Sequence, residues 1–290
     1  MKYAYYPGCS LHSTAKEYDL STRALCQALD IELEEIPGWI CCGASSGHMT
    51  SELLALALPV KNLVLAREMA LDTAVGCAAC YSRLKVANKA MSSDKERSRP
   101  YIDQVVGEPY RGEVRVRHVL EIVIQEYGLD ALQEKIKTGL QGLRIAAYYG
   151  CLLVRPPKVT AFDDPEDPTC MEALISTLGG DPVDWPYKTE CCGGSLSLTR
   201  TNVILKLCHD ILQMAADEGA ECVMVACPLC QSSLDLRQAQ VNKRYKTDLY
   251  LPILYFTQLT GLALGIEASK LGLDKHMVDP KKLLQDKGLI

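Results

Sequence analysis

The sequence predicts an α/β protein built from two duplicated cysteine-rich domains, each with a parallel-rich sheet. One observation is that ten of the 14 cysteines fall into two copies of one pattern. The other is that short apolar runs alternate with stretches of helical spacing in each copy, which favours parallel strands joined by helices. The two copies are Cys9, Cys41-Cys42-Gly43 and Cys77-Ala78-Ala79-Cys80, then Cys151, Cys191-Cys192-Gly193 and Cys227-Pro228-Leu229-Cys230.

In the first copy, each predicted element follows from apolar spacing. An apolar run that closes in Gly8 and Cys9 predicts a strand whose end delivers a cysteine to a loop. Residues 14–29 carry apolar residues at helical spacing, and residues 31–36 alternate as in a strand with one buried face. The Cys41-Cys42 loop then precedes a helical stretch at 50–71 that contains Pro59, a strand at 73–75 and a helix at 80–91.

The second copy repeats this order with one insertion. A strand at 146–149 leads to Gly150 and Cys151, and helical stretches at 196–217 and 230–241 flank a strand at 222–226. In both copies 34 residues separate the cysteine pair from the C-x-x-C, but the preceding spacer has 31 residues in the first copy and 39 in the second. The excess includes residues 162–168, which we interpret as an acidic, turn-rich loop.

The segment between the copies predicts a polar loop at Ser92–Pro100 and a helix at His118–Tyr127. We place the boundary near Gly139–Gly142, which gives an N-terminal cysteine-rich domain at 1–140 and a C-terminal one at 141–290. Because Cys9, Cys77, Cys151 and Cys227 all follow predicted strands, we expect ligands that are distant in sequence to converge beyond the carboxyl ends of the strands.

Composition limits the class of protein. The 290 residues carry a net charge of −5, 48% hydrophobic and 23% charged residues, which is typical of a globular protein and gives no reason to expect nucleic acid or an anionic membrane. We predict no signal peptide, because the N-terminal residues 1–9 contain no apolar run of sufficient length. We predict no membrane span, because the most apolar window, 251–266, is interrupted by Thr257, Gln258 and Thr260. The predicted location is the cytoplasm, where patterned cysteines are metal ligands or catalysts more often than disulfides.

Five thiols per copy favour an iron–sulfur centre. Five is an odd number for disulfides and exceeds the four ligands of a structural zinc ion, although four of the five could still form a zinc site in a scaffold protein. Two adjacent cysteines do not easily reach one tetrahedral metal, but they can serve two. Gly43 and Gly193 would let the backbone approach a bulky group, and peptide N–H groups of these loops could donate to its sulfur atoms.

The doubled pattern C-x31/39-C-C-G-x33-C-x-x-C resembles that of the heterodisulfide reductase B subunit over essentially the whole chain, including Tyr148–Pro156 and His276–Pro280. The resemblance implies that each half holds one non-cubane [4Fe-4S] cluster on its five cysteines. It also implies that the clusters face each other near a pseudo-twofold axis and that a disulfide, of the CoM-S-S-CoB type or a related bacterial one, is cleaved between them. Gly43 and Gly193 stand where methanogenic members tend to have proline, which favours the bacterial branches. The implied ligands are Cys9, Cys41, Cys42, Cys77, Cys80, Cys151, Cys191, Cys192, Cys227 and Cys230.

Partner proteins follow from what this chain does not contain. Many electron-transfer proteins with the same Cys-Cys-Gly repeat also carry a ferredoxin-like segment, which is absent from this sequence. The resemblance therefore implies a ferredoxin-like C subunit that supplies electrons, which it receives in turn from a flavin-containing A subunit. The alternative is an electron-relay subunit of a flavin-containing oxidoreductase complex, without a substrate of its own.

For the disulfide reductase, we predict that each cluster donates one electron to one sulfur of the bond. Cys42 and Cys192 are the predicted catalytic cysteines, acting through their clusters. His48, Arg83 and Arg155 are candidates for binding an anionic group of the substrate, or else surface and loop-stabilising residues. The cysteines outside the pattern are interpreted as small core residues, namely Cys26, Cys170, Cys208 and Cys222.

Overall fold

Two four-stranded parallel sheets form the framework of the protein in the computed structural model, which describes residues 1–44, 46–93, 96–197 and 199–290. The strand order is β2-β1-β3-β4 in the first sheet and β6-β5-β7-β8 in the second, so the halves repeat the same topology. The predicted α/β class with two duplicated parallel units is confirmed. The strands are β1 (Lys2–Tyr6), β2 (Glu32–Glu35), β3 (Thr73–Val75), β4 (Val116–His118), β5 (Arg144–Tyr148), β6 (Asp181–Val183), β7 (Cys222–Val225) and β8 (Ile253–Tyr255).

Most strands are buried along nearly their whole length because helices cover both faces of each sheet. Strands β3, β7 and β8 consist of buried residues throughout, and β1 and β5 are buried after their first residue. By contrast β2 lies at a sheet edge, and its residues alternate between exposed and half-buried. The predicted alternation at 31–36 therefore marks the edge strand.

In the first half, the helices confirm the predicted order with shifted bounds. Pro59 lies inside a continuous helix, and the helix predicted from 80 begins at Ala78. Part of the loop predicted at Ser92–Pro100 is helical at its end, since a helix starts at Arg99, while Asp94 and Lys95 lie outside the described residues. The helices are α1 (Gly8–His12), α2 (Lys16–Ala28), α3 (Gly47–Thr50), α4 (Glu52–Glu68), α5 (Ala78–Ser92) and α6 (Arg99–Val106).

The segment after β4 corrects one prediction. The helix expected from His118 begins one residue later, because His118 ends a strand and caps the helix through its ring nitrogen. A short α7 (Val119–Glu121) continues as a π-helix over Ile122–Gly128 and then as α8 (Leu129–Lys135). The chain then crosses to β5 through residues 136–143. The boundary at 140 stays a prediction.

In the second half, the helix predicted at 230–241 is two helices, α12 (Pro228–Leu236) and α13 (Gln238–Tyr245), which meet at Arg237. The apolar window at 251–266 contains β8 followed by α14 (Phe256–Ala263). Within the described ranges, no helix has both the length and the apolar character needed to cross a bilayer. The other helices are α9 (Pro157–Thr160), α10 (Cys170–Thr177), α11 (Thr201–Asp217) and α15 (Lys281–Asp286).

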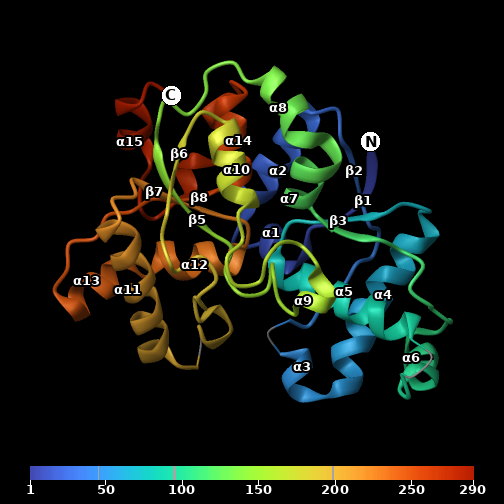
Figure 1. The fold of residues 1–290 in the computed structure, drawn as a ribbon. Coiled ribbons are helices and arrows are strands. Elements are labelled where there is room, and N and C mark those ends of the chain that lie inside the picture. The colour runs from blue at the N-terminus through green and yellow to red at the C-terminus, as the bar shows by residue number, and fades with distance from the viewer. Residues whose placement is uncertain (45, 94–95, 198) are drawn as a thin grey trace.

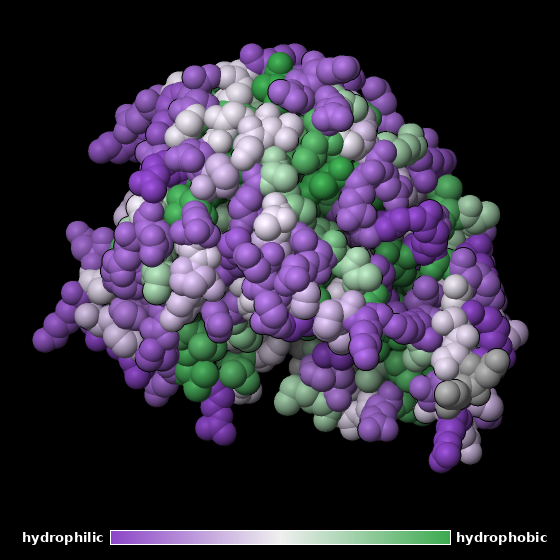
Figure 2. Space-filling model, in the orientation of Figure 1, coloured by the Kyte–Doolittle hydropathy of each residue, from purple (hydrophilic) through white to green (hydrophobic). Residues whose placement is uncertain are grey.

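The halves lie side by side and pack through helices (Figure 1). Helix α2 packs against α14, α5 against α9, and α1 against α12. At the lower edge of the face in Figure 2, a notch separates the halves, with α3 on one side and the α11–α12 region on the other, and apolar side chains gather on both sides. The ends of the strands that carry the cysteines therefore meet near the junction of the two halves.

Candidate functional site

Every cysteine of the doubled pattern follows the carboxyl end of a parallel strand. In the first half, Cys9 follows β1, the Cys41-Cys42 pair follows β2, and the C-x-x-C from Cys77 follows β3. In the second half β5, β6 and β7 deliver the equivalent cysteines. Because parallel strands end at one edge of their sheet, three loops distant in sequence converge there. The predicted convergence is confirmed and extends to the Cys-Cys loops.

Within each half, the thiols associate in two equivalent pairs. The Sγ atoms of Cys42 and Cys80 lie 3.2 Å apart, and those of Cys9 and Cys41 lie 4.0 Å apart. Each of the two adjacent cysteines thus also has a partner of its own from another loop, as expected if they are to serve different metal atoms.

The second half repeats this arrangement. Cys192 and Cys230 lie 3.6 Å apart between Sγ atoms, and Cys191 hydrogen-bonds with Cys151. In the part of the chain that the structure describes, no three His, Cys, Asp or Glu side chains are grouped as ligands of a single metal ion. The thiols are arranged instead as pairs around a shared space.

The glycine after each cysteine pair has the role that the sequence predicts. Gly43 and Gly193 have φ angles of 73° and 72°, in the region that favours glycine. This conformation turns their N–H groups onto the preceding thiol, at 3.4 Å from Gly43 N to Cys41 Sγ and 3.3 Å from Gly193 N to Cys191 Sγ. Backbone donors therefore stabilise negative charge on these two sulfurs.

A tyrosine from the central strand of each half supports the Cys-Cys loop. The Tyr6 hydroxyl donates to the carbonyl of Ile40 at 2.7 Å, and the Tyr148 hydroxyl donates to the carbonyl of Glu190 at 2.6 Å. Both carbonyls belong to the residue immediately before a cysteine pair, and both tyrosine side chains are fully buried. These tyrosines are buried and hydrogen-bonded, as expected from the sequence, and each fixes the entry of the loop that bears the cysteine pair.

The two C-x-x-C motifs begin helices and meet across the halves. Cys77 is the N-terminal cap of α5 and Cys227 that of α12, so both sulfurs lie at the positive ends of helix dipoles. The two thiols lie close enough across the junction to shift each other's pKa, that of Cys77 upward and that of Cys227 downward. Hydrogen bonds from Cys230 and Cys77, followed by the N–H groups of Cys230 and Leu229, hold the pKa of Cys227 well below its usual range. Equivalent cysteines of the two halves therefore lie near each other at the junction.

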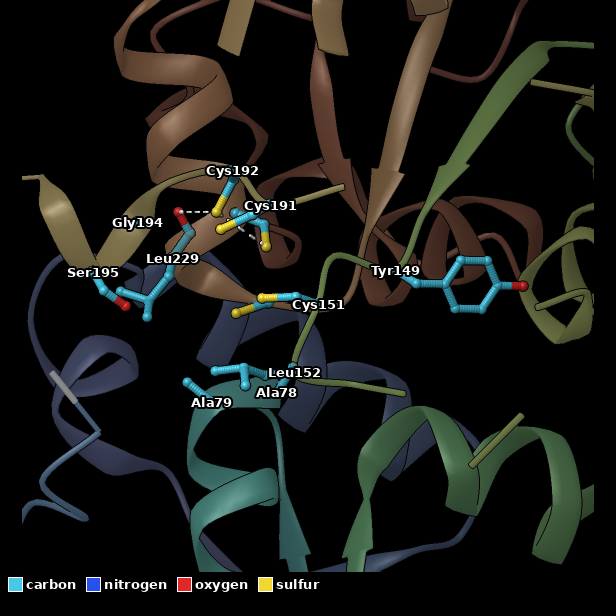
Figure 3. A pocket seen from close by; sticks show the side chains of 12 residues that line it. Ala78, Ala79, Tyr149, Cys151, Leu152, Cys191, Cys192, Gly194, Ser195 and Leu229 are labelled. Atoms are coloured by element: carbon cyan, nitrogen blue, oxygen red, sulfur yellow. Dashed lines mark hydrogen bonds between the residues drawn. The ribbon is translucent and has the colours of Figure 1, made fainter. Parts of the chain in front are cut away.

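All five cysteines of the second half line one narrow cavity at this junction (Figure 3). Ala78 and Ala79, from the first half, close its lower side in the view. The pKa of Cys191 is lowered to about 6, chiefly by its hydrogen bond with Cys151 and also by the Gly193 N–H. Five thiols around one space, with one already favoured as a thiolate, fit a polynuclear iron–sulfur group in which different sulfurs bind different irons.

The first half also contains a cysteine whose thiolate form is favoured. Hydrogen bonds from Cys41 and Cys80 lower the pKa of Cys42 well below its usual range, and the charge of Arg83 contributes in the same direction. Cys9 and Cys41 are exposed, whereas Cys42, Cys77 and Cys80 are buried. The buried sulfurs therefore face the junction, and the exposed pair lies toward solvent.

The three predicted anion-binding residues are placed differently. His48 and Arg83 line one cavity together. The Arg155 guanidinium is instead engaged within its own half, because it donates to the carbonyl of Thr189 at 3.2 Å and to the Glu166 carboxylate at 3.0 Å. Arg155 thus secures the acidic inserted loop, and its side chain is directed to that loop.

Sequence reasoning missed one residue near both thiol sites. His118 is fully buried at the carboxyl end of β4, beside the strand that leads to Cys77. Its ring lies close to the carbonyls of Gly76 and Ala226, the residues that precede Cys77 and Cys227. The available signal was the position at the end of a fourth strand, but β4 has only three residues, and the predicted helix began at the last of them, His118.

Comparison with known proteins supports the duplicated organisation. A family model for a cysteine-rich domain, CCG, matches residues 3–85 and 145–235. The 8-methylmenaquinol:fumarate reductase membrane anchor subunit of Wolinella succinogenes is 33% identical over 97% of this chain and 99% of its own length. The B subunit of the ferredoxin:CoB-CoM heterodisulfide reductase of Methanosarcina mazei is 31% identical over 96% of this chain and 94% of its own length.

A solved structure shares the fold. A hypothetical protein from Helicobacter pylori superposes with a TM-score of 0.73 over 96% of this chain at 14% sequence identity. This chain spans 52% of the length of that protein. The likeness therefore concerns the architecture of the two halves.

Proposed function

The chain belongs to the family of heterodisulfide reductase B subunits with tandem cysteine-rich CCG domains, and from this membership we propose that it is the iron–sulfur subunit of a reductase complex. More specifically, we propose that this subunit cleaves a small disulfide by reduction between two non-cubane [4Fe-4S] clusters. The observation that carries this proposal is the proximity of Cys77 and Cys227, which shift each other's pKa, so that one cysteine of each five-thiol site lies at the junction.

The ten cysteines would hold the two clusters, five in each half. Each cluster, when bound, supplies one electron at a time, and cleavage of one disulfide to two thiols consumes two electrons and two protons. The chain contributes the rest of the arrangement. Its glycine N–H groups donate to the thiols of Cys41 and Cys191, and the N-termini of α5 and α12 lie at Cys77 and Cys227. Two one-electron donors on either side of one bond match the demand of the reaction.

Partners and clusters are part of the same proposal. We expect electrons to come from a ferredoxin-like subunit, which a flavin-containing protein reduces in turn, because the sequence contains no ferredoxin-like segment. Each site approaches the surface at its exposed thiols, which are Cys9, Cys41 and Cys191. An electron-donating subunit would have the shortest electron-transfer distance to the clusters there.

Replacing one cysteine of a single site tests the arrangement. Cys192→Ser should lower the iron content from about eight to about four atoms per chain and abolish disulfide reduction, while the electron paramagnetic resonance (EPR) signal of the first site persists. Cys170→Ser, which removes a thiol outside the pattern, should leave the iron content unchanged. Full turnover by a Cys192→Ser protein with one remaining cluster would contradict the two-sided reaction.

A second function has a specific observation in its favour. The relative from Wolinella succinogenes is named for fumarate reduction, and fumarate contains no disulfide. On this alternative the chain relays electrons and has no substrate of its own. Oxidation of the reduced protein by a panel of small disulfides, followed by EPR, separates the two, because a relay would stay reduced with every disulfide.

A further inference from the structure

Among the described residues, two side chains that line one cavity of the first half each carry a buried nitrogen atom without a hydrogen-bond partner. The cavity has a volume of about 400 Å³, and Arg83 from α5 and His48 from α3 both line it. Among the described residues, Arg83 Nε and His48 Nδ1 are buried and unpaired. The other lining residues are Glu52, Ala55, Leu56, Glu96 and Ser98.

An unpaired guanidinium nitrogen in such a place is unusual. Buried polar groups in folded proteins nearly always have a hydrogen-bond partner, and an unpaired buried charge is costly. The acidic side chains of the cavity do not supply that partner. The Glu96 carboxylate accepts from the Ser98 N–H at 2.9 Å, and Glu52 is exposed at the start of α4. The Arg83 and His48 side chains, which are half-buried and line the cavity, are therefore available to a ligand with oxygen acceptors.

The cavity lies beside the junction of the two thiol sites. Arg83 is four residues after Ala79 on α5, so the two share one face of that helix. Ala79 lines the cavity of the second-half cysteines, and the charge of Arg83 acts on Cys42 of the first half. A molecule that reaches from the junction along this face of α5 would meet Arg83 one helical turn away.

The positive charge has no counterpart at the equivalent position of the second half. Arg83 lies six residues after Cys77, and the residue six after Cys227 is Ser233, whose side chain is buried and neutral. The arginine near the second site, Arg155, is already engaged with Glu166 and Thr189. The two sites are thus similar in their thiols but differ in their charge environment.

We propose that Arg83 and His48 form an anion subsite, which binds a carboxylate, sulfonate or phosphate group at one end of the molecule reduced between the two sites. This inference rests on the proposed disulfide reductase function. Because the second half has the neutral Ser233 at the position equivalent to Arg83, an asymmetric disulfide binds in one orientation, with its anionic end on the side of the first half. Each sulfur of the bond then faces a defined site.

Binding to the oxidised, cluster-loaded protein tests the subsite without turnover. The probes are 3,3′-dithiodipropionate, which has carboxylate ends, and bis(2-hydroxyethyl) disulfide, which is neutral. Wild-type protein should bind the carboxylate probe about tenfold more tightly, which corresponds to one charge-assisted hydrogen bond. Arg83→Gln should remove that preference and leave the affinity for the neutral probe unchanged. Arg83→Lys should retain part of the preference, since it keeps the charge without the planar fork.

Arg115→Gln is the matched control for the loss of one positive charge. Arg115 immediately precedes β4, and its side chain is 62% exposed and paired with Asp72 and Glu126. This variant should keep the wild-type preference. A charge preference that is absent from the wild type, or that persists in Arg83→Gln, overturns the subsite even if both disulfides are reduced.

A second measurement separates the subsite from the proposed function. Equilibrium dialysis with radiolabelled inorganic sulfate should show one bound ion per chain, lost in Arg83→Gln and retained in Arg115→Gln. If neither disulfide binds but sulfate behaves in this way, the reductase function fails and the anion subsite stands. If sulfate binding does not depend on Arg83, the subsite is wrong.

Discussion

His118 shows how a single buried residue connects the two thiol sites. Its imidazole is fully buried and faces the backbone that precedes both Cys77 and Cys227. Burial lowers the pKa of His118 to about 4, since the interior disfavours the charged ring, and the nearby sulfur and carbonyls offset only part of that effect. The ring is therefore neutral in the folded protein at neutral pH.

His118 should make folding stability depend on pH. A histidine whose folded pKa lies below the unfolded value of 6.5 takes up its proton more readily when unfolded, so its contribution to stability is lost as the pH falls from 6.5 toward 4. Between pH 7.5 and 5.5 the loss should be about 1 kcal/mol of unfolding free energy. Urea unfolding at both pH values measures it, and a His118→Gln variant with an unchanged pH dependence would contradict the assignment.

Other residues at this scale were predictable from the sequence. The ten patterned cysteines and the two glycines at Gly43 and Gly193 were identified because their spacing recurs and because glycine tolerates the conformation that they adopt. The engagement of Arg155 with the inserted loop was not predictable, since Glu166 and Thr189 reach it only through tertiary contacts.

At the scale of elements, the tight turn between the central strand and its cysteine leaves no room for a side chain. Gly150 has a φ of 63°, and a Cβ atom there would lie 2.8 Å from Cys230 Sγ. Gly8 has the same role in the first half, where a Cβ would lie 3.1 Å from Cys80 Sγ. The turn and the C-x-x-C loop are therefore packed directly against each other in both halves.

Gly150→Ala should damage the second site selectively. The added methyl group displaces the Cys230 sulfur and also carries the backbone cost of a positive φ, about 1–2 kcal/mol. We expect iron content to fall by about half while the first site stays loaded, as measured by iron analysis and EPR. Gly142→Ala is the control, because its φ is 66° but a Cβ there would meet nothing within 4 Å. This variant should lower the stability only by the cost of a positive φ and should leave the iron content unchanged.

The halves are joined by a packed polar and aromatic interface at the scale of the whole molecule. Tyr18 of α2 stacks on Tyr255 of β8, with ring centroids 4.0 Å apart and an interplanar angle of 7°. Ser21 and Thr257 hydrogen-bond at 2.7 Å beside this stack. The Tyr18 hydroxyl also donates to the carbonyl of Ala226 at 3.4 Å, next to Cys227. The same contacts that join the halves thus position the two thiol sites relative to each other.

Tyr18→Ala should weaken the whole molecule. Removing a fully buried aromatic ring costs about 3–5 kcal/mol of unfolding free energy. It should also loosen the junction, so that magnetic coupling between the two loaded clusters decreases in EPR. Tyr101→Ala is the control, because that side chain is 65% exposed on α6 and its loss should change stability by less than about 0.5 kcal/mol. Equal destabilisation by both variants would contradict the role of the interface.

The sequence by itself determined the duplication, the α/β class, the delivery of cysteines by strand ends and the thiol set of each half. These follow from local periodicity and spacing, which the chain carries without reference to its folded shape. The tertiary structure decided the proximity of Cys77 and Cys227, the place of His118 and the pairing of Arg83 with His48 around one cavity. These depend on how two folded halves pack, and no spacing within either half encodes the distance between them.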